Sequence, residues 1–232
     1  NATGFFSGDD DREGIQDAID AAILWLEDPA NAGAGSASVV FEAGGTYHLD
    51  STHPNRPAYA LLIQDLRANS DRLQLMGNDS TIVHRQLLNQ TLGIRTSGLV
   101  LVQDLTFDRD PLPYMDGNVE AVNGNLVTVR RVRGLSPLLF PPVAPAPSTI
   151  RHWGWVLDPM IPGRPKTGTA TFYEASSVTQ QGGDPDLFDF VLGPMGGVAI
   201  ADDFAVGDRF SYHYREGGNN IQIRGSSNVE VR

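Results

Sequence analysis

The sequence predicts an all-β protein: a right-handed parallel β-helix with an N-terminal capping helix and an inserted small antiparallel β-barrel or sandwich. Three observations predict it. An amphipathic helix leads into a short apolar strand and a Gly-Gly turn within the first fifty residues. Short apolar runs then recur between polar turns, and two of these segments resemble each other. Longer alternating segments lie between the two copies and predict the insert.

The helix is expected to begin near Asp10 or Asp11 and to end at Asp28-Pro29. Either aspartate can accept a hydrogen bond from the first turn, where the helix dipole also favours negative charge. Proline stops the helix at its other end. Apolar residues recur at spacings of three and four, which gives the helix one apolar face: Ile15, Ile19, Ala22, Ile23 and Leu26. Such a face must lie on something, and the open end of a stack of strands is a suitable surface.

The strands that follow are short and closely spaced, as expected for the sides of β-helix coils. Residues 92–101 and 221–231 each read as strand, arginine, serine-containing turn and strand, and residues 70–75 form a weaker third copy. Inward side chains of such coils are expected to stack on those of neighbouring coils.

The insert is predicted from strands that lengthen and alternate after Gly117. Asn123-Gly124-Asn125 lies between two alternating apolar segments and predicts a tight hairpin. We therefore expect three parts: residues 1–116 as the cap and first coils, 117–216 as the barrel-like insert, and 217–232 as the return to the β-helix.

Composition narrows the possible partners. The 232 residues carry a net charge of -11, which argues against nucleic acid or an anionic membrane as partner. The absence of cysteine excludes disulfides, thiol chemistry and cysteine-bound metals. No histidine spacing predicts a zinc site, and we expect neither a metal nor a cofactor. Arginine greatly outnumbers lysine, since Lys166 is the only lysine, and this indicates either a bacterial source with a GC-rich genome or adaptation to salt.

At this point the residues carry a family resemblance. The helix followed by Val39-Val40-Phe41 and Gly44-Gly45-Thr46-Tyr47-His48-Leu49 resembles the start of the pectate-lyase-like right-handed β-helix superfamily. The run from Leu105 to Val122, the insert and the return at Ile221 are more narrowly similar to the bacterial α-1,3-galactosidases of glycoside hydrolase family 110.

The resemblance implies a glycoside hydrolase that cleaves terminal α-linked galactose, or a related glycan, by paired carboxylates without a cofactor. Its partner would be an oligo- or polysaccharide, and we expect a secreted or periplasmic bacterial protein. Enzymes of this kind continue for many coils after the insert. We therefore expect this chain to be the N-terminal part of a longer protein or to form a homo-oligomer, with the main catalytic carboxylates beyond Arg232.

Within the chain, Asp108 and Asp110 are the candidate catalytic pair. Alternation along a strand places both on one face about 7 Å apart, a separation that glycosidases use. The alternative is a turn that leads into the insert, with the aspartates hydrogen-bonded to the backbone. Tyr114, Arg215 and Glu216 are the candidate substrate-binding residues, and Arg215 is suited to hold a sugar hydroxyl or carboxylate.

Other motifs leave two interpretations open. Asp9, Asp10 and Asp11 suit either calcium or helix capping. Trp153 and Trp155 share one face of a strand and form either a sugar-stacking platform or, as we expect, part of the barrel core.

Two other functions remain open besides hydrolysis. A polysaccharide lyase would act on a uronate polymer, and a non-catalytic β-helix would only bind its glycan.

Overall fold

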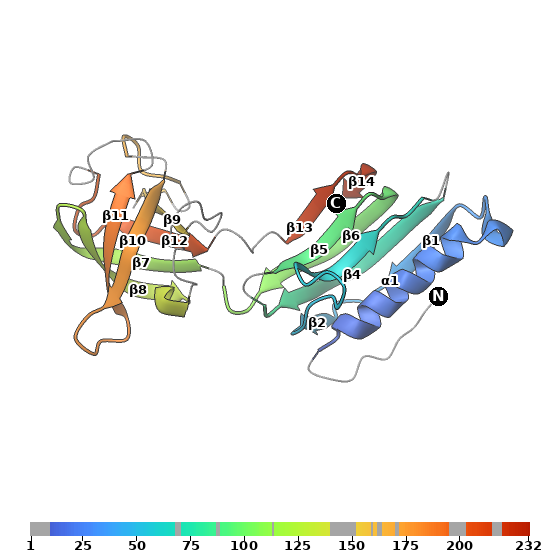
Figure 1. Ribbon diagram of the computed structural model, residues 1–232, viewed down its shortest axis with the longest axis horizontal. Coiled ribbons are helices and arrows are strands. Elements are labelled where there is room, and N and C mark those ends of the chain that lie inside the picture. The colour runs from blue at the N-terminus through green and yellow to red at the C-terminus, as the bar shows by residue number, and fades with distance from the viewer. Residues whose placement is uncertain are drawn as a thin grey trace. The chain divides into compact units, whose positions relative to one another are not determined.

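The computed structural model describes residues 10–67, 71–86, 89–112, 114–139, 152–158, 160–161, 164–169, 172–194, 203–214 and 220–232 (Figure 1). The chain forms two compact units. The first, the discontinuous unit, comprises Asn1–Asp110 and Gly217–Arg232, and the second, the inserted unit, comprises Pro111–Glu216. The described chain is mostly β-structure with parallel sheets and one α-helix. The insert thus begins six residues before the predicted residue 117, because strand β7 (Tyr114–Asn123) runs through Gly117 without a break.

Helix α1 (Arg12–Glu27) begins and ends where the sequence predicts. Oδ1 of Asp10 accepts hydrogen bonds from the backbone N–H of Arg12 at 3.1 Å and from that of Asp50 at 3.0 Å. Oδ2 of Asp11 accepts one from His48 N–H at 2.8 Å. Asp10 therefore accepts an N–H of the first turn, and both carboxylates bind the start of the helix to the next segment of the unit. The helix is followed directly by a single 3-10 turn, η1 (Pro29–Asn31).

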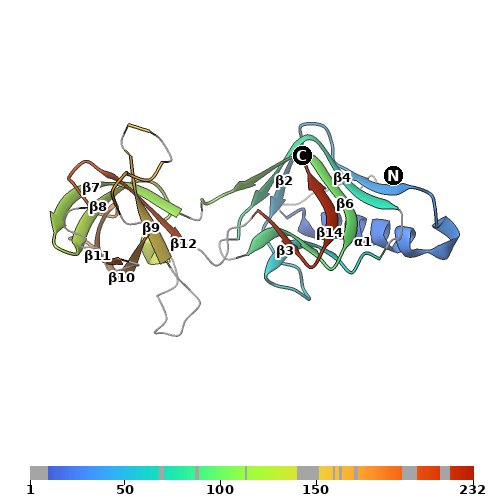
Figure 2. The same ribbon diagram turned by 90° about the horizontal axis from the view of Figure 1, so that it is seen from above.

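The discontinuous unit consists of parallel strands in two sheets, and Figure 2 shows several of them side by side. One sheet has the order β1-β4-β6-β14, with β2 also paired to β4, and the other has the order β3-β5-β13. From β3 onward the strands alternate between the sheets, so each pairs with a strand of the preceding or following turn of the chain. The strands are β1 (Ser36–Val40), β2 (Thr46–Leu49), β3 (Tyr59–Gln64), β4 (Arg72–His84), β5 (Gln90–Arg95), β6 (Gly98–Arg109), β13 (Ile221–Arg224) and β14 (Ser227–Val231).

The two similar segments of the sequence lie against each other in matching register. Ile221 lies opposite Leu92, and seven residues further along Asn228 matches the place of Leu99. The corner between the strands also repeats, because Thr96 and Gly225 both have positive φ, +48° and +58°. The two copies of the internal repeat therefore pair with each other as parallel strands in matching register.

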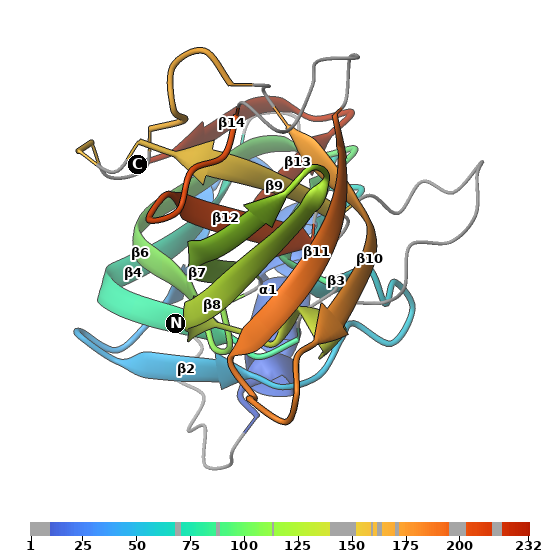
Figure 3. The same ribbon diagram turned by 90° about the vertical axis from the view of Figure 1, so that its left-hand side faces the viewer.

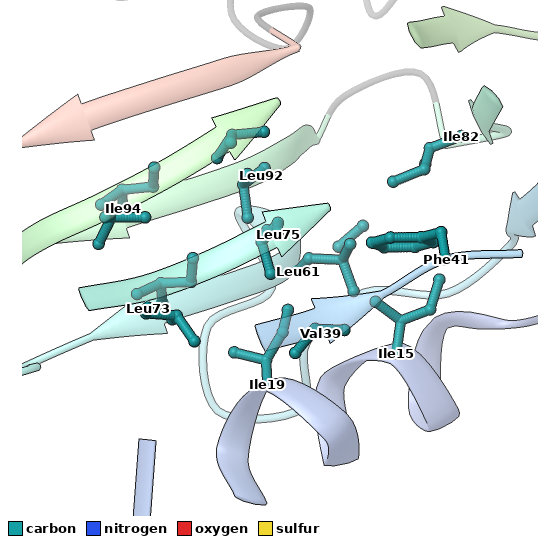
Figure 4. Close-up of a cluster of buried hydrophobic side chains, with 14 of the residues drawn as sticks. Ile15, Ile19, Val39, Phe41, Leu61, Leu73, Leu75, Ile82, Leu92 and Ile94 are labelled. Atoms are coloured by element: carbon teal, nitrogen blue, oxygen red, sulfur yellow. The ribbon is translucent and has the colours of Figure 1, made fainter. Parts of the chain in front are cut away.

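The core of this unit lies between the sheets and α1. Figure 4 shows Ile15 and Ile19 of the helix pointing toward the aliphatic side chains of the strands. Gln16, which is 4% exposed, covers the free edge of β3. Its amide donates to the carbonyl of Leu62 at 2.9 Å and accepts from the N–H of Leu62 at 2.8 Å. The helix thereby satisfies backbone groups that an edge strand otherwise leaves unpaired.

The inserted unit is a closed antiparallel barrel with the strand order β10-β11-β8-β7-β12-β9; its strands face the viewer in Figure 3. Besides β7, its strands are β8 (Leu126–Gly134), β9 (His152–Leu157), β10 (Tyr173–Gln180), β11 (Leu187–Pro194) and β12 (Arg209–Tyr214), and a 3-10 turn, η2 (Pro137–Leu139), follows β8. The predicted hairpin is confirmed: β7 and β8 join through Gly124-Asn125, and Gly124 has φ +60°, as such tight turns require.

Each barrel strand divides its side chains between the interior and the outer surface. On β12, Phe210 and Tyr212 are buried in the aromatic core, whereas Arg209, Ser211 and His213 alternate with them and lie on the outer face. The period of two therefore determines which residues of each strand are available for a site on the outside of the barrel.

No helix among the described residues is both long and apolar enough to cross a membrane.

Candidate functional site

The candidate catalytic pair lies at the end of β6 in the discontinuous unit. Asp108 and Asp110 are both exposed and alternate with the buried Arg109, so they share a face as predicted. Oδ1 of Asp108 accepts a hydrogen bond from the backbone N–H of Arg109 at 2.7 Å. The N–H of Asp110 donates to the carbonyl of His84 at 3.3 Å. Neither carboxylate lines the cavity described below. The hydrogen bond from Arg109 N–H to the Asp108 side chain is of the kind that the turn interpretation requires, whereas the contact of Asp110 is a backbone hydrogen bond that continues the β4–β6 pairing.

Arg109, between them, is a residue that the sequence did not single out. It is 7% exposed, and burial lowers the pKa of its guanidinium. The guanidinium donates to the carbonyls of Gln86 at 3.1 Å and Asn89 at 2.7 Å, and to Oδ1 of Asn220 at 3.3 Å. It thus joins the segment that leaves the discontinuous unit to the segment that returns to it.

A cavity of about 400 Å³ lies on the outer surface of the barrel, a size within the range of small-molecule sites. Its side chains come from four neighbouring strands, β8, β7, β12 and β9, and from the segment after β9. The lining residues are Tyr114, Asp116, Arg133, Trp155, Leu157, Asp158, Pro165, Arg209, Ser211 and His213. Of the predicted binding residues, Tyr114 therefore lies in a cavity.

Asp116 is at the centre of the polar contacts in the cavity, and it is 2% exposed. Oδ1 accepts a hydrogen bond from the hydroxyl of Ser211 at 2.5 Å. Oδ2 accepts from Nε of Arg133 at 2.8 Å, and Nη2 of the same guanidinium lies 2.7 Å away. Nη2 of Arg209 lies 3.6 Å from this oxygen. The hydrogen bonds to Asp116 and its negative charge raise the pKa of Arg133, so the buried carboxylate is paired with cations on one side and a hydroxyl on the other.

His213 continues this chain of contacts. Its Nε2 lies 2.8 Å from the hydroxyl oxygen of Ser211. Since that hydroxyl donates its proton to Asp116, Nε2 is the donor to Ser211 and Nδ1 is left as an acceptor. Burial lowers the pKa of His213 to about 4, although the charge of Asp116 opposes the shift. The imidazole is therefore neutral at pH 7.

Aromatic rings surround this histidine. The ring of Tyr114 stacks on His213 with centroids 5.2 Å apart and planes 26° apart. The ring of Trp155 meets His213 edge to face at 4.5 Å. The guanidinium of Arg133 lies over the ring of Tyr114, and its central carbon is 5.6 Å from the ring centroid. The cavity thus combines flat apolar faces with fixed hydrogen-bonding groups.

The expectation that Trp153 and Trp155 belong to the barrel core is wrong. Gly154 and Val156, which alternate with them, face the core instead. At Gly154 an added Cβ would lie 2.2 Å from the ring of Phe210, so only glycine fits there. Both tryptophans therefore lie on the outer face, where they contact Phe172 at centroid distances of 4.7 and 5.3 Å. Trp155 also lines the cavity.

The remaining candidates lie elsewhere or outside the described residues. Arg215 and Glu216 are among the residues that the structure does not describe, as is Asp9. Asp10 accepts the N–H of Arg12 in the first turn, as helix capping requires, whereas Asp11 accepts the N–H of His48 and makes no side-chain capping hydrogen bond. Within the described ranges, no group of three or more histidine, aspartate or glutamate side chains is placed to hold a metal ion.

The site residues that the sequence reasoning missed are Asp116, Arg133, Arg209, Ser211 and His213. They lie up to 97 positions apart in the chain and meet only because β8, β7 and β12 are neighbours in the barrel. The sequence signal that could have identified some of them is the alternation on β12, where arginine, serine and histidine alternate with two aromatic residues and so share one face of the strand.

A scan against protein-family models finds no match for this chain, and a search of curated proteins finds no relative.

Proposed function

We propose that this chain is part of a carbohydrate-active protein and that the barrel cavity holds a sugar. The observation that carries the proposal is the combination of Tyr114 and Trp155 with the hydrogen-bonding groups of Arg133, Arg209 and Asp158 in one cavity. Sugar rings have apolar faces that pack on aromatic rings, and hydroxyls that need fixed donors and acceptors.

The architecture we propose for the discontinuous unit is a right-handed parallel β-helix capped by α1. Its parallel pairing, the alternation of the chain between two sheets and the matching register of β5 with β13 support this assignment. The resemblance to pectate-lyase-like proteins and to family 110 glycosidases then points to a glycoside hydrolase that cleaves terminal α-linked galactose without a cofactor. A secreted or periplasmic location in a bacterium belongs to the same proposal.

In this proposal Asp108 and Asp110 are the candidate catalytic carboxylates among the described residues. Both are exposed and lie on one face of the strand end, as an acid and its partner must. Asp116 is unsuited to that role. Both of its oxygens already accept hydrogen bonds, and two guanidinium groups stabilise its charged form.

A second candidate function is glycan binding without catalysis. The cavity itself favours it, because Asp116 is held by arginine and Ser211 donates its proton to that carboxylate. Nε2 of His213 donates to this serine and so does not act as its base, and the carboxylate that accepts the serine proton is already paired with arginine. A lyase that acts on uronate polymers is the third possibility.

The test uses the full chain and α-linked galacto-oligosaccharides. Titration calorimetry is expected to detect binding that Trp155→Ala weakens at least tenfold. Trp25→Ala is the matched control, because Trp25 lies on α1 in the other unit. Binding that is absent, or that survives Trp155→Ala unchanged, would overturn the assignment of the cavity.

Release of galactose distinguishes the two leading functions. Turnover that falls by orders of magnitude in Asp108→Asn or Asp110→Asn supports the hydrolase. Binding without release of galactose, and without the absorbance near 235 nm that a lyase product gives, supports the binding protein.

A further inference from the structure

Most N–H donors of Arg209 in the cavity have no protein acceptor. Arg209 makes one ion-pair contact, 3.6 Å from Nη2 to Asp116. Its Nε is buried and has no hydrogen-bond partner among the described residues. Arg133 directs Nε and Nη2 to Asp116. Because each guanidinium carries five N–H donors in a planar fork, most of those on Arg209 remain available.

The acceptors of the cavity are largely occupied. Both oxygens of Asp116 are engaged by Ser211, Arg133 and the approaching Arg209. Oδ1 of Asp158, the other carboxylate of the cavity, accepts the backbone N–H of Met160 at 2.8 Å. Among the carboxylate and imidazole acceptors of the cavity, Oδ2 of Asp158 and Nδ1 of the neutral His213 remain.

This imbalance favours a ligand that brings acceptor oxygens of its own. The Arg209 side chain is 42% exposed, so an acceptor of the ligand can replace water at its remaining N–H groups. Carboxylate and sulfate groups are acceptors only, and their paired oxygens match the fork of arginine. Tyr114 and Trp155 line the same cavity and give the body of the same ligand apolar surface to pack on.

We propose that the cavity selects a sugar that carries an oxyanion substituent, a carboxylate or a sulfate ester, and that Arg209 holds that group. This inference rests on the proposed function, since it takes the ligand to be a sugar, and it adds the chemical class of the sugar. The overall negative charge of the chain does not oppose it, because Arg133 and Arg209 balance the carboxylates of Asp116 and Asp158 within the cavity.

The experiment compares ligands that differ only in the substituent. Galactose, galacturonic acid, the methyl ester of galacturonic acid and galactose 6-sulfate are titrated into the full chain by calorimetry at low ionic strength. We expect galacturonic acid to bind at least tenfold more tightly than its methyl ester. This ratio should fall as salt is added, because the contact is ionic. A tighter complex with the sulfate than with the carboxylate would identify sulfate as the natural substituent.

Two variants assign the effect to the cavity. Arg209→Gln is expected to reduce the ratio of acid to ester affinity to about one, whereas Arg85→Gln, a partly exposed arginine of the other unit, leaves it unchanged. Asp158→Asn keeps the acceptor for Met160 but removes a charge, and it is expected to raise the affinity for the acid severalfold. This second variant keeps the test decisive if Arg209→Gln does not fold.

The outcomes separate this inference from the proposed function. Equal affinities for acid and ester, in binding that depends on Trp155, overturn the inference and leave the sugar site intact. An acid preference that survives Arg209→Gln also overturns it. No binding by any of the four sugars or by galacto-oligosaccharides overturns both proposals.

Discussion

The pH dependence of stability should reveal the buried His84. This residue ends β4, is 1% exposed, and has its Nδ1 3.1 Å from the hydroxyl of Thr91. Its Nε2 is buried without a hydrogen-bond partner among the described residues. Burial, and then the charge of Arg109, lower its pKa from 6.5 to about 4. Arg109 is its partner in the β4–β6 pairing.

The direction of the effect follows from where the proton binds. Above pH 6.5 the imidazole of His84 is neutral in both the folded and the unfolded chain, so its titration does not reduce the free energy of unfolding. Between pH 6.5 and about 4 the unfolded chain binds a proton that the folded chain does not. Stability is therefore lost as the pH falls through this interval. A difference of about 2.5 units corresponds to about 3 kcal/mol, the upper limit of the contribution of His84.

The assay compares urea denaturation of the chain with that of His84→Gln between pH 7.5 and 4. Replacing Trp153 and Trp155 by phenylalanine in both proteins leaves Trp25 as the only tryptophan, so its fluorescence reports the unit that contains His84. The variant is expected to be less stable at pH 7.5. The gap in the free energy of unfolding should then narrow by about 3 kcal/mol toward pH 4. If the free energies of unfolding of the two proteins changed in parallel with pH, His84 would not be the source of the pH dependence.

Two substitutions test the packing of the discontinuous unit. Gln16→Ala leaves the N–H and carbonyl of Leu62 without their buried partner and is expected to cost about 2–3 kcal/mol in denaturant unfolding; a loss below about 0.5 kcal/mol would mean that water replaces the amide without cost. Gly93→Ala places a Cβ 2.4 Å from the ring of Tyr59 and should destabilise the chain by about 1–3 kcal/mol. Adding Tyr59→Ala to Gly93→Ala should relieve the part of this cost that comes from the clash with the ring. A double variant that loses as much stability as the two single variants combined would contradict this explanation.

Local signals predicted the elements of the fold that depend on neighbouring residues. Helix α1 is fixed by acidic residues before it, by an apolar stripe and by Pro29. The β7–β8 hairpin is fixed by Gly124. The pairing of residues 92–95 with 221–224 was also predictable, because the two segments have similar sequences and similar segments of a repeat are expected to pair in register.

The orientation of Trp153 and Trp155 was not predictable in the same way. Alternation shows that the two rings share a face, but it does not show which face lies inside a barrel. The glycine between them contained the answer, since Phe210 fills the space where a side chain at Gly154 would lie. That information comes from β12, more than fifty positions further along the chain.

The same limit applies to the candidate site. Tyr114 was identified beside a strand end, but the partners that give it a cavity come from other strands. Asp116 does not resemble a site residue in the sequence, because its importance depends on Arg133, Arg209 and Ser211 approaching it after the barrel closes. Local sequence patterns indicate which residues of a strand share its outer face. Only the order of the strands in the barrel shows which outward residues of different strands lie together.

A crystal structure of the chain grown with an α-linked galacto-oligosaccharide tests the central claim most directly. We predict a sugar ring packed against Tyr114 and Trp155, with its polar groups within hydrogen-bond distance of Arg209 or Asp158. A sugar bound only beside Asp108 and Asp110, or an empty barrel cavity at saturating ligand, would contradict the assignment.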